Sequence, residues 1–193
     1  VKKRAGRVKA RFINDAMMAT LMGGIVSDGL DNGQVVSGVG GQYNFISQGF
    51  ALEGARSAIV LRSHRVIKGR AQSNIRWNYG HTTIPRHLRD IVITEYGVAD
   101  LRGKADRDVV AAMLSVADAR FQDELLGKAK TAGKIEKDFK IPQAWRNNTP
   151  AFIARALAPA RDRGVLPPFP FGTDFTPAEQ KLLPALKVLK SAS

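Results

Sequence analysis

Residues 94–103 read Thr-Glu-Tyr-Gly-Val-Ala-Asp-Leu-Arg-Gly and combine acid, base, aromatic and glycine in one short run. The run follows an apolar segment and fits neither a helical nor a strand period, which predicts a loop. Charged side chains are rarely buried unless they are paired. Glu95, Asp100 and Arg102 are therefore either parts of a functional site or an ion pair that fixes a loop to its domain. The residue types alone leave both interpretations open.

A glycine cluster in residues 37–45, Ser-Gly-Val-Gly-Gly-Gln-Tyr-Asn-Phe, is a second candidate site. Glycines between a strand and a helix let a ligand approach the backbone, and the first amides of the helix can hold an anion or a developing oxyanion. The dinucleotide fingerprint requires glycine or alanine where Tyr43 stands, and the Gly-Lys-Ser/Thr of a Walker loop is absent. The alternative is a tight glycine turn without a ligand.

Other catalytic and metal-binding patterns find little support. The three histidines, His64, His81 and His87, do not have the spacing of a metal site, and the chain has no cysteine. A triad of Ser37, His64 and Asp100 lacks a nucleophile-elbow sequence, and we reject it. We therefore predict that no metal is bound.

The net charge of +13 is concentrated in two segments. Residues 1–12 hold six bases and no acid, and residues 62–107 hold ten bases against four acids. Trp77 and Tyr79 beside Arg76 are able to stack on a base, although such residues also occur at strand edges. A basic nucleic-acid-binding module is thus an alternative function, but we favour a solvated stub for residues 1–12.

Length and composition indicate one sizeable domain. The 193 residues contain no apolar run of membrane-spanning length, which predicts a protein without membrane association. The absence of cysteine fits a reducing, cytoplasmic location. Because the chain begins at Val1, we expect it to be a piece of a longer protein.

The first half of the chain predicts an α/β layer. Periodicity predicts helices over 10–22 and 45–52 and strands over 34–39, 57–61 and 90–94. Strands that alternate with helices at this spacing favour parallel neighbours in the sheet.

The second half predicts packing helices and a helical tail. Asp106 and Asp118 are expected to cap two helices, the second of which stops at Gly133. A further helix opens at Thr149-Pro150, and a capping box begins the last one at Thr176. The proline-rich segment 166–172 is expected to be irregular.

The glycine cluster, the basic segment and Asp90–Lys104 together resemble the C-terminal domain of the acetyl-CoA hydrolase/transferase family, a branch of the class I CoA-transferases. The resemblance covers roughly residues 14–130. It implies a mixed, mainly parallel sheet flanked by helices, followed here by a helical tail. We expect a basic stub at 1–12, the CoA-transferase-like domain at 13–145 and the tail at 146–193.

The resemblance implies that coenzyme A serves as substrate or covalent intermediate, with no metal. A glutamate attacks an acyl-CoA and passes through an acyl-glutamyl anhydride to a glutamyl-CoA thioester. Water or a small carboxylate completes the reaction. Since that glutamate lies upstream of the glycine cluster in the family, we expect no catalytic residue in this chain. The expected partners are an N-terminal domain of the same protein and a second copy in a homodimer. Nucleic acid is not an expected partner.

By the resemblance, the coenzyme A contacts are Ser37, Gly38, Gly40, Gly41 and Lys68. Glu95, Asp100 and Arg102 are expected to shape the floor of the site and the domain contact. Asn44 stands where an aspartate is common, and Ser73-Asn74-Ile75-Arg76-Trp77 replaces a more usual Ser-x-Ile-Val-Pro. The acyl group, and the choice between hydrolase and transferase, stay open.

Overall fold

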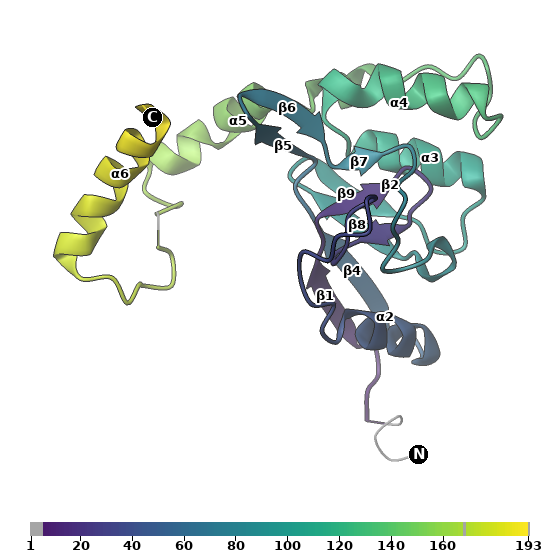
Figure 1. The fold of residues 1–193 in the computed structure, drawn as a ribbon, viewed down its shortest axis with the longest axis horizontal. Helices are drawn as coiled ribbons and strands as arrows, with labels where there is room; N and C mark the ends of the chain where they lie inside the picture. The colour runs from purple at the N-terminus through teal and green to yellow at the C-terminus, as the bar shows by residue number, and fades with distance from the viewer. Residues whose placement is uncertain (1–5, 168, 193) are drawn as a thin grey trace. The chain divides into compact units, whose positions relative to one another are not determined.

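The computed structural model describes residues 6–167 and 169–192, and it divides the chain after Ile153 into two compact units (Figure 1). The first unit holds the sheets, and the second holds the end of the chain. Part of the basic segment 1–12, including Lys2, Lys3 and Arg4, lies outside the described residues. The predicted domain boundaries at 12/13 and 145/146 stay predictions.

The main sheet has the strand order β1 (Arg11–Asp15), β4 (Arg56–Val60), β8 (Ile91–Thr94) and β9 (Gly97–Asp100). β1 pairs with β4 in parallel, and β4 pairs with β8 in parallel. β9 returns antiparallel to β8. The prediction of a mixed, mainly parallel sheet is therefore confirmed.

Two smaller sheets accompany it in the first unit. β2 (Met18–Thr20) lies between β3 (Ile25–Val26), to which it is antiparallel, and β7 (Ile75–Arg76), to which it is parallel. β5 (His64–Ile67) and β6 (Arg70–Ser73) form a separate antiparallel hairpin.

Helices flank the main sheet, as predicted (Figure 1). α2 (Gln42–Ala51) packs against β1 and β4, while α3 (Asp106–Ser115) packs against β9 and against α4 (Ala119–Thr131). Short 3-10 helices cover Arg86–Leu88 and Gln143–Asn147.

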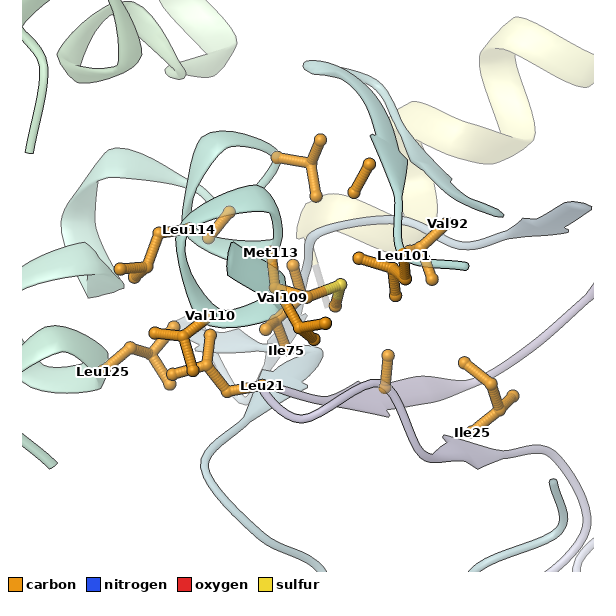
Figure 2. Packing of buried hydrophobic residues seen from close by; sticks show 14 of the residues in the cluster. Leu21, Ile25, Ile75, Val92, Leu101, Val109, Val110, Met113, Leu114 and Leu125 are labelled. Carbon is orange, nitrogen blue, oxygen red and sulfur yellow. The ribbon is translucent and has the colours of Figure 1, made fainter. Parts of the chain in front are cut away.

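One apolar core joins α3 to the strands (Figure 2). α3 buries one stripe at helical spacing, Val109, Val110, Met113 and Leu114, each of them fully inaccessible. The strands and turns supply the facing side chains, among them Leu21, Ile25, Ile75, Val92 and Leu101, and α4 supplies Leu125.

The second unit consists mainly of α6 (Pro177–Ala192) and most of α5 (Pro150–Asp162), which starts at the predicted proline. The capping box is confirmed: Thr176 donates its amide to Glu179 Oε2 at 2.8 Å, and the amide of Glu179 donates to Thr176 Oγ1 at 3.3 Å. Among the residues described, no helix combines the length and the apolar character needed to cross a membrane.

The helix predicted over 10–22 is wrong, because this segment forms β1 and β2. Side chains in β1 alternate between exposed and half-buried, and Phe12 stacks on Phe45 of α2 with ring centroids 6.0 Å apart. Residues 11–15 form a strand because they pair with β4 and pack against α2. The apparent helical period arose because the residues of β1 and β2 were taken as one element.

The strand predicted over 34–39 is also wrong. Only Val35 makes an isolated bridge, to Gly29, and its side chain is 73% exposed. The amides of Val36 and Ser37 donate to Asp28 O instead of to a neighbouring strand. β-branched residues do not form a strand here because no partner strand lies beside them.

The run 94–103, predicted as a loop, contains a strand. Thr94 pairs with Gly97 across a two-residue turn, and Ile91 pairs with Asp100, so Gly97–Asp100 forms β9. Thr94 Oγ1 accepts the amide of Tyr96 at 3.1 Å and holds the turn. The charged residues of this run are therefore placed by sheet pairing.

Of the two predicted aspartate caps, one is confirmed. Asp118 caps α4 by accepting the amide of Arg120 at 3.0 Å. Asp106 does not cap α3, whose N-cap is Ala105. Its carboxylate pairs instead with Arg86, Arg89 and Lys134, so these cations take the place of the backbone amides.

Two glycines near the end of α4 predict opposite effects on stability. A Cβ at Gly127, inside the helix, meets no atom within 4 Å, so Gly127→Ala should raise the free energy of unfolding by about 0.5–1 kcal/mol. Gly133 has φ +63°, so Gly133→Ala should lower the free energy of unfolding by about 1–2 kcal/mol. This loss is expected although a Cβ at Gly133 also meets no atom within 4 Å. Urea unfolding of both variants measures the difference; equal shifts would contradict this reading.

Candidate functional site

The parallel strands β1, β4 and β8 end at one edge of the main sheet, at Asp15, Val60 and Thr94. In open α/β sheets, ligands bind outside the carboxyl ends of parallel strands. The segments that follow these three strands therefore define where a site is expected. The glycine cluster and Glu95 both lie at this edge.

The glycine cluster is held at the end of β1 by the start of α2. Gln42 Nε2 donates to Asp15 O at 2.7 Å, which fixes the first residue of the helix to the last residue of the strand. Gly40 has φ +54°, a left-handed conformation that favours glycine. α2 has no side-chain cap and no acidic residue in its first turn, so its positive end stays available to an anion.

An open hollow of about 440 Å³ lies between the cluster and the end of β1. Ser37, Gly38 and Gly41 line it, together with residues 14–17 that follow β1 and with Phe45 of α2. Ser37 Oγ donates to Ser27 O at 3.2 Å. A Cβ at Gly38 meets nothing within 4 Å, so the hollow is accessible along this part of the backbone.

Glu95, in the turn after β8, is fixed by Ser63 from the segment after β4. Its Oε2 accepts the Ser63 amide at 2.8 Å, and its Oε1 accepts the Ser63 hydroxyl at 2.6 Å. His64 Nδ1 lies 3.4 Å from Glu95 Oε1 and 3.4 Å from Asp118 Oδ2. Glu95 is thus a positioned carboxylate in a polar cluster, with 31% of its side chain exposed.

Asp118 is the buried member of this cluster. Its fully inaccessible carboxylate accepts the Tyr96 hydroxyl at 2.8 Å and two bonds from the Arg120 guanidinium at 2.8 Å. Burial by itself raises the pKa of Asp118, but the bonds from Arg120 and Tyr96 outweigh it and hold that pKa below its usual value. Burial, with a smaller contribution from Asp118, raises the pKa of the Tyr96 phenol. At neutral pH the pair is therefore a phenol that donates to a carboxylate.

Lys68 lies in the two-residue turn between β5 and β6, and it does not line the hollow beside the glycine cluster. Lys68 and Gly69 have φ 49° and 72°, as in a type I′ hairpin turn. The lysine is exposed at the tip of the hairpin. Its backbone is strained for a residue with a side chain, since a left-handed φ outside glycine is uncommon.

Asp100 and Arg102 lie at the opposite, amino edge of the sheet. Asp100 Oδ1 accepts from Arg56 at the start of β4 at 2.6 Å. Arg102 donates to Asp90 Oδ2 at 2.6 Å and lies over the ring of Phe50 at 4.2 Å. The structure therefore brings Glu95 to the edge that holds the glycine cluster, and it places Asp100 and Arg102 in an ion-pair network away from that edge.

Sequence reasoning missed Gln42, Ser63 and Asp90. Each contacts a partner far along the chain: Gln42 reaches Asp15, Ser63 holds Glu95, and Asp90 joins two arginines. For Ser63 a signal was present, because it lies two residues beyond the predicted buried strand 57–61, at the edge where sites form.

The sequence model of the acetyl-CoA hydrolase/transferase C-terminal domain family matches residues 2–129 of this chain. The chain belongs to this family. The resemblance drawn from the glycine cluster and residues 90–104 is thereby confirmed.

Relatives of this acetyl-CoA hydrolase/transferase domain include CoA-transferases. The 4-hydroxybutyrate coenzyme A transferase of Clostridium kluyveri is 32% identical over 120 residues, which cover 61% of this chain and 28% of that protein. A probable butyrate:acetyl-CoA coenzyme A-transferase of Syntrophomonas wolfei is 29% identical over 132 residues, covering 67% and 29%. The crystal structure of RipA from Yersinia pestis matches with a TM-score of 0.57 at 30% identity, covering 65% of this chain and 28% of that one. The chain thus matches less than a third of the length of each.

Proposed function

We propose that this chain is the coenzyme A-binding C-terminal part of an acyl-CoA transferase or acetyl-CoA hydrolase. Membership of the acetyl-CoA hydrolase/transferase C-terminal domain family is the observation that carries the proposal. The hollow beside the uncapped start of α2 supports it, because a thioester oxygen that gains negative charge needs backbone donors aimed at it.

The proposed reaction is an exchange of thioesters. A glutamate outside this chain attacks the acyl carbon, an acyl-glutamyl anhydride forms, and the thiolate of coenzyme A leaves. The thiolate then attacks the glutamyl carbon, releases the acyl group as a carboxylate and leaves a glutamyl-CoA thioester. A second carboxylate takes this intermediate through the same steps in reverse, or water hydrolyses it to glutamate and free coenzyme A.

The residues proposed to bind coenzyme A are Ser37, Gly38, Gly40, Gly41 and Lys68. The glycines allow the pantetheine chain to lie along the backbone beside the hollow, where a side chain would occupy the same space. Lys68 offers an exposed cation for a phosphate, as a compact point charge on a flexible stem.

The proposed role in shaping the site falls chiefly to Glu95. Its two bonds from Ser63 fix the turn after β8 to the segment after β4, so the floor of the carboxyl edge is tied together across two strands. Asp100 and Arg102 act on the site only through the sheet that they stabilise from its other end. Because Glu95 is engaged by Ser63, we do not propose it as the nucleophile.

The wider assignment follows from the same proposal. An N-terminal domain of the same protein would supply the glutamate, and an acyl-CoA and a small carboxylate would be the substrates. A homodimer and a cytoplasmic location belong to this proposal as well. Among the described residues, no group of three or more histidine, aspartate or glutamate side chains is placed to hold a metal ion.

The purified 193-residue chain is expected to leave acetyl-CoA intact, because the proposal places the nucleophilic glutamate outside it. Release of free thiol, followed with a chromogenic disulfide reagent, measures this directly, and the absence of cysteine means that the protein itself gives no background. Thiol release above the rate in buffer, abolished by Glu95→Gln, would place the nucleophile in this chain and contradict the proposed mechanism.

A further inference from the structure

A second cleft, of about 580 Å³, lies in the first unit. The β5–β6 hairpin, residues 75–79 and α4 supply most of its lining, and none of the proposed coenzyme A contacts takes part. Its volume lies in the range of sites that hold small molecules.

Two arginines line this cleft with unused hydrogen-bonding capacity. Arg65 comes from β5 and Arg76 from β7, and the Nε atom of each is buried without an acceptor among the described residues. Arg76 makes one long bond, from Nη2 to Gln72 Oε1 at 3.4 Å. Neither guanidinium is paired with a carboxylate within the described part of the chain. Guanidinium groups suit phosphate oxygens because their donors form a planar fork.

Aromatic rings line the same cleft. Trp77 and Tyr79 follow Arg76 in sequence, and Phe121 comes from α4. Aromatic faces bind nucleobases by stacking, which complements phosphate recognition by arginine. Trp77 and Phe121 also pack against the apolar core but are only partly buried, so part of each ring remains available to a ligand.

The acidic residues of the cleft are compatible with this ligand. Glu124 is paired with Lys128, which also lines the cleft and whose Nζ lies 2.5 Å from Glu124 Oε1. The other acidic residue that lines the cleft is Asp31. Carboxylates in nucleotide sites accept hydrogen bonds from ribose hydroxyls.

We propose that this cleft binds a nucleoside phosphate, with Arg65 and Arg76 on the phosphates and Trp77 or Tyr79 on the base. The proposal does not rest on the thioester chemistry above. A free nucleotide and the adenosine phosphate end of coenzyme A share this recognition chemistry, and the test distinguishes these two sources.

The test follows the fluorescence of Trp77 while ADP is added. The chain has two tryptophans, so Trp145→Phe leaves Trp77 as the reporter. Saturable quenching is expected, and Arg65→Gln and Arg76→Gln should each weaken ADP binding about tenfold, as the loss of one charge-assisted bond predicts. Arg161→Gln, in the second unit, is the matched control and should change nothing. If Arg76→Gln lowers the melting temperature, its weaker ADP binding could reflect partial unfolding, and the ADP affinity of Arg65→Gln then decides the test.

The outcomes separate the possible ligands. No saturable quenching, or equal competition by inorganic phosphate, would overturn the proposal. Tighter binding of a short oligonucleotide, with affinity that grows with its length and falls steeply with salt, would overturn it in favour of nucleic acid. If coenzyme A displaces ADP, the cleft holds the nucleotide end of coenzyme A; if both bind together, the cleft takes a free nucleotide. Gly38→Val should leave the ADP signal unchanged, so the two proposals fail separately.

Discussion

Replacing Asp90 by alanine is expected to lower the free energy of unfolding by about 3–5 kcal/mol, the usual cost of removing one partner of a buried ion pair. The Asp90 side chain is 1% exposed and accepts from Arg56 at 2.7 Å, from Arg102 at 2.6 Å and from the Ser57 amide at 2.6 Å. Without it, two guanidinium groups and one buried amide lose an acceptor. Urea unfolding followed by circular dichroism measures the loss.

Asp100 provides a matched control for this prediction. It accepts from the same Arg56 at 2.6 Å, but 51% of its side chain is exposed. Exposed ion pairs contribute about 0–1 kcal/mol, so Asp100→Ala should cost far less than Asp90→Ala. Similar losses for both variants would show that burial does not decide the strength of this network.

Replacing Asp118 by alanine has the second largest expected effect, a loss of about 2–4 kcal/mol. The α4 cap accounts for about 1 kcal/mol of it. The Tyr96 hydroxyl, left without its buried acceptor, accounts for about 1–3 kcal/mol. Asp123→Ala is the control, since Asp123 pairs with Arg146 at 2.6 Å but is 76% exposed and should contribute less than about 1 kcal/mol.

The effect of Asp118→Ala should also depend on pH. The pKa of Asp118 is held below its usual value in the folded chain, so its contribution is present above the unfolded pKa of about 4 and is lost as the pH falls through the folded value. The difference in unfolding free energy between the wild-type chain and the variant should therefore narrow from about pH 4 downward. A difference that stays constant down to pH 2 would contradict the assigned pKa direction.

Sequence patterns predicted correctly those elements whose residues depend on near neighbours in the chain. The apolar runs of β4 and β8, the Asp118 cap and the capping box at Thr176 depend on neighbours within a few positions. β1 was missed because it is a half-exposed edge strand whose stability comes from β4, more than forty positions later. The strand predicted over 34–39 failed for the converse reason, since no other strand lies beside it.

The candidate site shows the same limit. The glycine cluster and Glu95 were recognised from sequence, and the fold brings both to the carboxyl edge. Asp100 and Arg102 lie at the other edge because β9 runs antiparallel to β8. Sequence analysis predicted a loop for this run and therefore did not predict that pairing. The bonds from Ser63 to Glu95 span thirty-two positions and follow only from the pairing of strands.

Calorimetric titration of coenzyme A into the 193-residue chain tests the central claim most directly. The hollow beside the glycine cluster predicts saturable binding that Gly38→Val weakens about tenfold, because the new side chain enters space where no protein atom lies within 4 Å. Gly127→Ala, equally free of protein contacts but on α4, should bind as the wild-type chain does. Equal affinity of all three chains, or no binding by any of them, would contradict the assignment of this edge as the coenzyme A site.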